Sequence, residues 1–412
     1  MYTTRKVAGN PTHFRETFSN AFTLKIILTL VFPFFMAGVG WILGYNRNEI
    51  YFLLILAFTQ ALLQLFMFFR TGFQTAQFFR LDAVFSIVDK LILLVIVFLL
   101  LAYHINLELF IFSRLASACL SVFIAYFVFI KIFGWLKPAF ESKRMKEIIA
   151  LSIPFAIMTS LYSLNEKIDQ VMLERIGEAS AAQLNAGLYA ASYRWLEACQ
   201  MYLWTVLPLF FAKFAVHQHE PEKLSKVVKM GQIVSALPMI FATVFVLFYA
   251  EKLFWLFDNS SIAEIKIMAG TLKILFLTAL VNGFFAVYGS LLSCLGHASQ
   301  LSKVIILSII LNAVLNVLFI PAYGTYAAAW ATFLSVSLLS ISYILMVCKN
   351  HVWGISSAIL LRLAGLLLGL LSIFWILQFL GFEWYITTLV GGIALLVMSY
   401  FSGLFKYLQL NE

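Results

Sequence analysis

Charged residues are scarce in this sequence. Asp, Glu, Lys and Arg together make up 11% of the chain, whereas hydrophobic residues make up 63%. Soluble domains are about 25% charged and roughly 45–50% apolar. This composition excludes a water-soluble fold, because no soluble core could bury so much apolar surface. The excess must therefore face lipid. The apolar runs do not alternate with polar residues as barrel strands do, so we expect an all-α integral membrane protein.

Cysteine and nucleotide-binding motifs are also nearly absent. The four cysteines are scattered, without a CxxC pair or a histidine at ligand spacing. This pattern favours small packing residues over a metal site or a disulfide. The absence of a GxxxxGK[ST] loop argues against ATP hydrolysis by the chain itself. We therefore expect neither a metal nor a cofactor.

What the sequence does contain is a series of long apolar segments. A spanning helix needs roughly 20 apolar residues to cross a bilayer. About twelve segments meet this description, at 22–43, 50–70, 84–104, 108–131, 147–172, 184–212, 228–250, 267–296, 302–322, 325–348, 354–380 and 384–405.

The connections between these segments alternate in their content of Lys and Arg. Basic loops stay on the cytoplasmic side of a membrane. The net charge of +9 therefore indicates orientation, and we expect no nucleic acid partner. The alternation and the even number of segments both predict a multi-pass protein with both termini in the cytoplasm.

A weak internal repeat predicts two helical lobes. Residues 99–123 resemble residues 318–342. Repeated lobes with substrate between them are typical of transporters. The pattern predicts a lobe of four helices at 1–134, a lobe of six at 147–348, and a trailing helix pair at 354–405. The first two helices of the second lobe have no counterpart in the first, so the N-terminal lobe is expected to be truncated by two helices.

Charged residues inside the apolar segments are the candidates for function, because each costs about 2.5–3.5 kcal/mol on insertion scales. Glu166 and Asp169 lie three residues apart and share a helix face. One interpretation is that they line a central cavity, where either carboxylate couples transport to a cation or a proton. The other interpretation is that they lie in the outer headgroup zone and cap the helix.

A cationic set is predicted in the outer half of the helical bundle. Arg194 and Glu197 are three residues apart near the middle of the next segment. Arg194 is a candidate anchor for a phosphate, since a guanidinium suits two-point contacts, with Glu197 a candidate for ion coupling. The alternative is a closed structural ion pair. Lys167, Arg114 and Lys273 complete a set suited to an anionic cargo, although Arg114 and Lys273 can instead snorkel to the interface.

Two stretches have a distinctive pattern. SIPFAIMTSLYSLNEKIDQVML at 152–173 precedes GLYAASYRW at 187–195, and LNAVLNVLFIPAYGTYAAAWAT occupies 311–332. They resemble the polysaccharide biosynthesis proteins, or Wzx-type O-antigen flippases, of the multidrug, oligosaccharidyl-lipid and polysaccharide exporter superfamily. The matching residues are Pro154, Asp169, Gly187, Tyr189, Asn312, Asn316, Pro321, Gly324 and Ala327 to Ala329. Taken by themselves, Asn312 and Asn316 are expected to form interhelical hydrogen bonds.

The resemblance implies a fold and a function. It implies the two-lobed architecture of the multidrug exporters, and a protein of the bacterial inner membrane. The implied activity is not enzymatic: it is the movement of an undecaprenyl-pyrophosphate-linked oligosaccharide to the outer leaflet for O-antigen, capsule or exopolysaccharide assembly. Expected partners are this lipid-linked oligosaccharide, membrane lipids and glycan assembly enzymes.

Two other functions remain open at this stage. A multidrug or small-molecule exporter coupled to a cation would belong to the same superfamily, although drug cations favour an acidic cavity. A membrane glycan polymerase or ligase has similar hydropathy but generally needs a sizeable outer loop. The longest outer loop predicted here, 251–266, is short.

Overall fold

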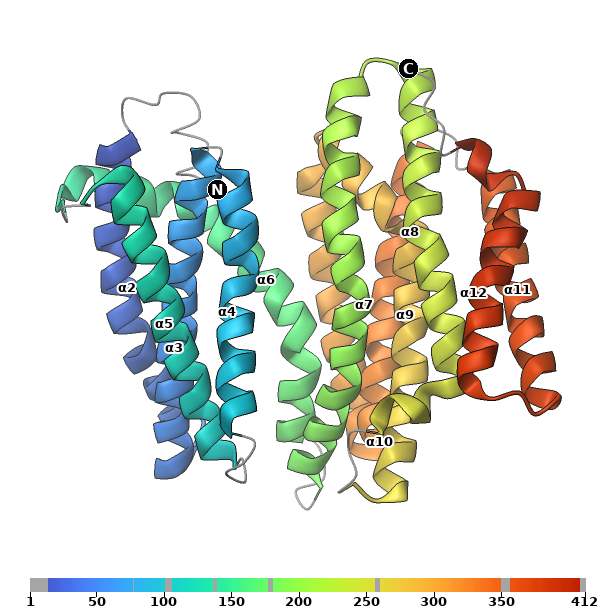
Figure 1. The fold of residues 1–412 in the computed structure, drawn as a ribbon, viewed down its shortest axis with the longest axis horizontal. Helices are drawn as coiled ribbons and strands as arrows, with labels where there is room; N and C mark the ends of the chain where they lie inside the picture. The colour runs from blue at the N-terminus through green and yellow to red at the C-terminus, as the bar shows by residue number, and fades with distance from the viewer. Residues whose placement is uncertain are drawn as a thin grey trace. The chain divides into compact units, whose positions relative to one another are not determined.

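The described residues of the chain are almost entirely helical (Figure 1). A computed structural model describes residues 14–76, 78–100, 106–135, 139–176, 181–255, 260–349 and 356–407. Within these ranges the chain contains no strand. It divides into two compact units, Met1–Thr159 and Ser160–Glu412. The break falls inside a helix, later in the chain than the connection between residues 134 and 147 at which the sequence analysis divides the lobes.

The first unit is a bundle held together by aromatic side chains. Its helices are α2 (Phe14–Ile42), α3 (Arg47–Thr75), α4 (Phe79–Leu100), α5 (Leu107–Phe133) and the first part of α6 (Ser142–Ile176). Phe18, Phe69, Phe73 and Phe129 are fully buried where α2, α3 and α5 meet. Aromatic pairs add about 0.5–1.5 kcal/mol beyond the burial of their area. This cluster fixes the packing of three helices in one place.

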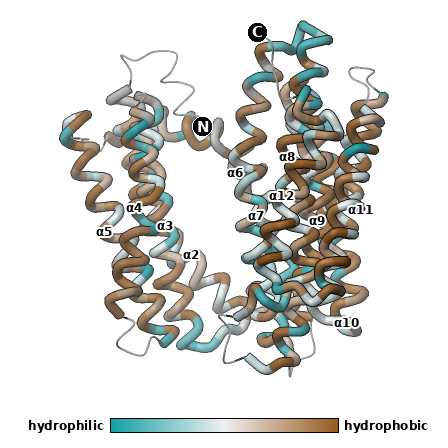
Figure 2. Tube along the Cα trace, turned by 45° about the vertical axis from the view of Figure 1, so that its right-hand side comes forward, coloured by the Kyte–Doolittle hydropathy of each residue, from teal (hydrophilic) through white to brown (hydrophobic). Residues whose placement is uncertain are grey.

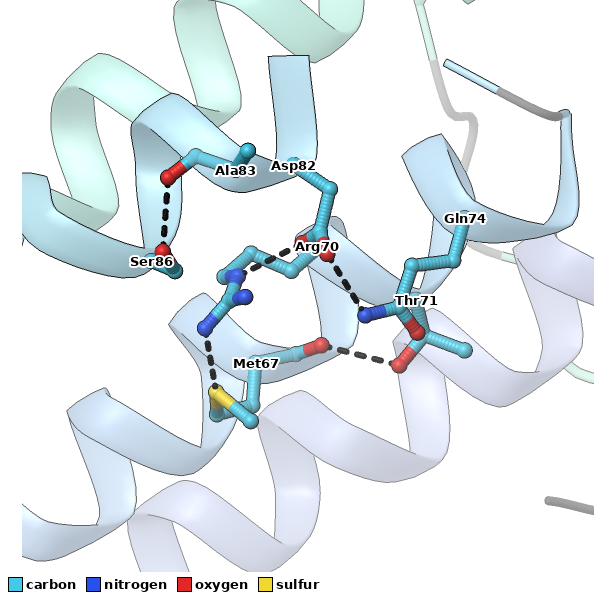
Figure 3. Close-up of polar contacts among 7 residues, drawn as sticks. All are labelled: Met67, Arg70, Thr71, Gln74, Asp82, Ala83 and Ser86. Atoms are coloured by element: carbon cyan, nitrogen blue, oxygen red, sulfur yellow. Dashed lines mark hydrogen bonds and ion pairs between the residues drawn. The ribbon is translucent and has the colours of Figure 1, made fainter. Parts of the chain in front are cut away.

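The turn between α3 and α4 is clamped by a mostly buried carboxylate (Figure 3). Arg70 Nε donates to Asp82 Oδ1 at 2.7 Å, and Gln74 Nε2 donates to Asp82 Oδ2 at 2.8 Å. Both oxygens of Asp82 on α4 therefore accept from α3. A buried charge that loses its partner keeps its desolvation cost. We therefore expect this clamp, formed by Asp82 with Arg70 and Gln74, to stabilise the folded protein.

We expect Arg70→Ala to lower the free energy of unfolding by about 1–3 kcal/mol, because it leaves Asp82 without a cation. Thermal unfolding of the detergent-solubilised protein measures this. Lys90→Ala is the matched control, since Lys90 is an exposed partner of Asp89 at 3.1 Å and its loss should change little. Equal unfolding midpoints for Arg70→Ala and Lys90→Ala would show that the clamp is not stabilising.

The second unit is built around one central helix. After the last part of α6, its helices are α7 (Ala182–His217), α8 (Pro221–Tyr249), α9 (Ile262–Cys294), α10 (Ala298–Lys349), α11 (Ser357–Phe379) and α12 (Trp384–Phe401), with 3-10 turns at Ala250–Phe254 and Leu404–Tyr407. Helix α9 packs against α7, α8 and α10, and α11 and α12 pack on α8 (Figure 1). Small residues allow close approach: a Cβ on Gly283 of α9 would lie 2.6 Å from the Met239 side chain of α8.

Helix α10 is bent sharply at Gly324. The backbone there has φ 53° and ψ −128°, so the helix consists of two arms that meet at this residue. A positive φ strains any residue with a Cβ, which explains why glycine follows Pro321 at the bend. The bend brings residues from the two arms close together, and this positions the site described below.

The prediction of an all-α membrane protein is confirmed. Within the described ranges, nine helices are long and apolar enough to cross a membrane. The predicted segments 302–322 and 325–348 correspond to the two arms of α10, which counts once among the nine. Helices α6 and α7 occupy the predicted positions 147–172 and 184–212 but are not among the nine.

Apolar residues dominate the middle of the helices (Figure 2), and polar residues gather mainly towards helix ends and connections. Helix α4 ends at Leu100, and the last residues of the predicted segment 84–104 lie outside the described part of the chain.

Candidate functional site

The candidate residues of the second unit gather on the hairpin formed by α6 and α7. Asp169 lies seven residues before the end of α6, and Arg194 lies twelve residues after the start of α7. At 1.5 Å per residue, these positions are about 10 Å and about 18 Å from the helix ends. The neighbouring arms of α10 complete the surroundings of Asp169.

Asp169 is completely enclosed by hydrogen-bond donors from three segments. Its exposed fraction is 1%. The Tyr189 hydroxyl of α7 donates to Oδ2 at 2.7 Å, and the Thr332 hydroxyl of the second arm of α10 donates to the same oxygen. Asn316 Nδ2, on the first arm of α10, donates to Oδ1 at 2.6 Å. Buried carboxylates require such partners, because an isolated charge in an apolar interior is very costly.

Asn312 and Asn316 can present either donors or acceptors to the Asp169 cluster. Asn316 Nδ2 also donates to Asn312 Oδ1 at 2.9 Å, whereas Asn316 Oδ1 is buried without a hydrogen-bond partner among the described residues. An amide carries donors on nitrogen and acceptors on oxygen. Rotation of the two amides would therefore turn oxygens towards Asp169 in place of N–H groups, which is the arrangement that a bound cation needs.

The chemistry of this cluster fits a proton or an alkali cation. Its one ionisable carboxylate is surrounded by neutral polar groups, the hydroxyls of Tyr189 and Thr332 and the amides of Asn312 and Asn316. In the described part of the chain, no group of three or more His, Cys, Asp or Glu side chains is placed to hold a metal. Intramembrane carboxylates commonly serve as coupling sites for Na⁺ or H⁺, often beside broken helices such as α10.

We expect Thr332→Val to lower the free energy of unfolding by about 1–3 kcal/mol, because a methyl group replaces a donor to a buried carboxylate. The midpoint of thermal unfolding in detergent measures the effect. Thr388→Val on α12 is the matched control, since the Thr388 hydroxyl donates to the Trp384 carbonyl of its own helix at 2.6 Å. If both variants unfold at the same temperature, Thr332 does not stabilise the Asp169 cluster.

A second cluster on the same hairpin joins two cations through one carboxylate. Arg194 Nη1 donates to Glu197 Oε2 at 2.7 Å, and Lys167 Nζ donates to Glu197 Oε1. The ammonium of Lys167 also lies 5.2 Å from the centre of the Tyr193 ring, within the range of a cation–π contact. The side chain of Glu197 is 19% exposed, whereas those of Lys167 and Arg194 are 41% and 73% exposed.

The two clusters are adjacent on α7. Tyr189, Tyr193 and Glu197 recur every four residues and therefore lie along one stripe of the helix. The rings of Tyr189 and Tyr193 are stacked, with centroids 5.8 Å apart. Tyr189 contacts Asp169 and Tyr193 lies beside Lys167, so the stack connects the two clusters.

The structure brings some of the predicted site residues together. Glu197, a candidate for ion coupling, pairs with Arg194 as in the alternative of an ion pair, and it also pairs with Lys167. Lys273 is half-buried on α9. Arg114 is half-buried on α5 of the first unit. Glu166 belongs to α6, but its side chain lies outside the described part of the structure.

Sequence reasoning missed two members of the Asp169 cluster. Thr332 was noted only as the last residue of a matching stretch, and Tyr189 only as one of the matching residues. A signal was present: Asn312 and Asn316 are four residues apart, and Thr332 is as far beyond Gly324 as Asn316 is before it. A sharp bend at Gly324 places these positions opposite each other. The interhelical hydrogen bond predicted for Asn316 is confirmed.

An apolar groove occupies the angle between the arms of α10. It has a volume of about 500 Å³ and is lined by Phe319, Tyr323, Tyr326 and Trp330 together with aliphatic side chains of the same helix. Ala327 and Ala331 also line it, and their neighbours Ala328 and Thr332 belong to the Asp169 cluster. The groove therefore lies next to the candidate ion site.

Comparison with solved structures shows the fold. The lipid II flippase MurJ in its inward closed conformation matches with a TM-score of 0.76 and 15% identity, over 97% of this chain and 87% of that chain. A multidrug resistance MATE family transporter in the inward-facing conformation matches with a TM-score of 0.68 and 12% identity, over 84% and 85%. The crystal structure of MATE in complex with MaL6 gives 0.60 and 13%, over 84% and 81%. The fold is thus MATE-like.

Comparison with family models shows the family to which the sequence belongs. No curated protein matches it. The MatE family model matches residues 214–318. The model of the polysaccharide biosynthesis proteins matches residues 2–210, just over half of the chain. The expected resemblance is confirmed, and the chain belongs to the polysaccharide biosynthesis protein family.

Proposed function

We propose that this protein is a flippase that moves an undecaprenyl-pyrophosphate-linked oligosaccharide from the cytoplasmic to the outer leaflet of the bacterial inner membrane. The observation that carries the proposal is the pair of cations, Lys167 and Arg194, held together by one carboxylate on the hairpin of α6 and α7. We place this hairpin in the membrane, where cations are costly unless they bind something. Membership of the polysaccharide biosynthesis family supports a lipid-linked glycan as the cargo.

The two cations suit a diphosphate. Arg194 offers a planar fork of donors to two phosphate oxygens, and Lys167 offers a compact positive charge. Arg194 is 73% exposed on its unit, so its guanidinium is accessible to a ligand. The lipid chain of the cargo remains in the bilayer while its charged head is moved.

The Asp169 cluster would supply the driving force. Binding of a proton or an alkali cation neutralises a carboxylate that otherwise depends on Tyr189, Asn316 and Thr332. The cluster joins α6, α7 and both arms of α10, so a change in its charge alters the packing of three helices. Coupling of this kind is the basis of alternating access in secondary transporters.

We infer from the basic residues of the connecting loops that both termini lie in the cytoplasm. The protein is a transporter and not an enzyme, and its partners are the lipid-linked oligosaccharide, membrane lipids and the enzymes that assemble O-antigen, capsule or exopolysaccharide.

The test is reconstitution of the purified protein into liposomes with a fluorescent lipid-linked oligosaccharide in the bilayer. Movement between leaflets is followed by a quencher that cannot cross the membrane. We expect faster movement than in protein-free liposomes, and little movement of a neutral lipid-linked sugar that lacks phosphate. Equal rates with and without protein would contradict the flippase proposal.

A second candidate function is export of small apolar cations. The aromatic groove of α10 favours it, because a volume of about 500 Å³ falls within the range of small-molecule sites and aromatic faces attract organic cations. Liposomes loaded with ethidium distinguish the two. Efflux of ethidium without movement of the lipid-linked sugar would support export over flipping.

A further inference from the structure

Glu197 bridges the two cations that the proposed function assigns to the phosphates of the cargo. Each of its two carboxylate oxygens accepts from a different cation: Oε1 from Lys167 on α6, and Oε2 from Arg194 on α7. Two oxygens of a phosphate group could bridge the same two cations in the same way. The anion is also the most buried member of the three, behind the more exposed cations.

We propose that Glu197 is an internal substitute for phosphate, which holds Lys167 and Arg194 together in the empty protein and is displaced by a phosphate of the cargo. This inference rests on the proposed flippase function and adds a positioning residue to it. The ligand chemistry is a phosphate ester or diphosphate attached to a lipid.

The charge balance of the cluster supports this role over a purely structural pair. One carboxylate neutralises one of the two cations, so the three side chains together carry a net positive charge. A structural pair would need a single cation, and the second would add an uncompensated charge to the hairpin, which the proposed function places in the membrane. The remaining positive charge attracts an anion with more than one negative charge, such as a diphosphate.

The internal anion also has consequences for organisation and release. Lys and Arg side chains are long and lose much rotamer freedom when they are held in place. Glu197 restricts them before cargo arrives, with Tyr193 beside the ammonium of Lys167. When the diphosphate leaves, Glu197 can take back both cations. Glu197 therefore competes with the cargo for the two cations. This competition weakens binding of the cargo but speeds its release.

The test compares binding of farnesyl diphosphate to the full-length protein in nanodiscs, by isothermal titration calorimetry at fixed salt concentration. Glu197→Gln removes the competing charge, so we expect it to bind about tenfold tighter than the wild type. Glu197→Asp keeps the charge on a side chain shorter by one methylene, which cannot span both cations. We expect its affinity to lie between the two.

Controls separate this role from other effects. Glu220→Gln removes an exposed carboxylate paired with Lys223 at 2.6 Å, outside the hairpin, and should bind like the wild type. Farnesol, which lacks phosphate, should show no dependence on residue 197. A purely structural pair would give equal or weaker binding in Glu197→Gln, and that result would overturn the inference while leaving the flippase proposal intact. Failure of the wild type and every variant to bind farnesyl diphosphate would overturn both.

Discussion

Replacing Asp169 with asparagine is expected to reduce gradient-driven movement of the lipid-linked oligosaccharide by at least about a hundredfold while the protein remains folded. Asparagine has nearly the same shape and can still accept from Tyr189, Thr332 or Asn316 through its oxygen. It cannot bind a proton or hold a cation by charge. Since an ion drives transport only if it binds the two states of the protein differently, removal of the charge removes the drive.

The measurement is the initial rate of movement in liposomes with an imposed sodium or proton gradient, together with the thermal unfolding midpoint. Asp89→Asn is the matched control, because the same substitution there affects a carboxylate paired with the adjacent Lys90. We expect that control to retain most of the wild-type rate. Full gradient-driven transport by Asp169→Asn would show that Asp169 is a structural residue.

Arg194→Ala is expected to lower transport by roughly ten- to a hundredfold without a comparable loss of stability. Charge-assisted hydrogen bonds contribute about 1.5–3 kcal/mol, and each 1.4 kcal/mol corresponds to a factor of ten in affinity. The side chain of Arg194 is largely exposed, so its removal leaves no cavity in the core. Lys167 would still neutralise Glu197.

Two further variants define the role of Arg194. Arg194→Lys should retain part of the activity, because it keeps the charge but replaces a planar fork with a point charge. Arg47→Ala is the control: Arg47 is an exposed arginine at the start of α3 in the first unit. Equal loss of transport and of protein level in Arg194→Ala would instead favour a structural ion pair. Wild-type transport by Arg194→Lys would contradict two-point binding of phosphate.

Much of the fold could be predicted from the sequence because lipid constrains it strongly. Long apolar segments must be helices in a bilayer, so their number and positions follow from hydropathy. The pair formed by Arg194 and Glu197 was also predictable, because residues three apart meet on a helix surface. The participation of Lys167 was not, since it depends on how α6 packs against α7.

The Asp169 cluster shows where sequence reasoning stops. Two of its members, Asp169 and Thr332, lie far apart in the chain. They meet because α10 bends at Gly324 and packs beside α6 and α7. From the sequence, Asp169 is expected either in a cavity lining or in a headgroup zone, whereas in the structure it is enclosed within the second unit. Spacing along one helix could not reveal partners supplied by the two arms of another.

The Asp169 cluster and the cluster of Lys167, Arg194 and Glu197 lie on the same hairpin of α6 and α7. Asp169 and Lys167 are two residues apart on α6, and Tyr189 and Glu197 lie on one stripe of α7. The stacked rings of Tyr189 and Tyr193 connect them. We therefore expect a change in the charge of Asp169 to affect the helices that hold Lys167 and Arg194.

The most direct measurement is the affinity of the purified protein for farnesyl diphosphate as the concentrations of sodium ions and protons are varied separately at constant ionic strength. We expect the affinity of the wild type to change with one of these ions, and that of Asp169→Asn to be independent of both. An affinity that depends on neither ion in the wild type, or that depends on them equally in Asp169→Asn, would contradict coupling between the two clusters.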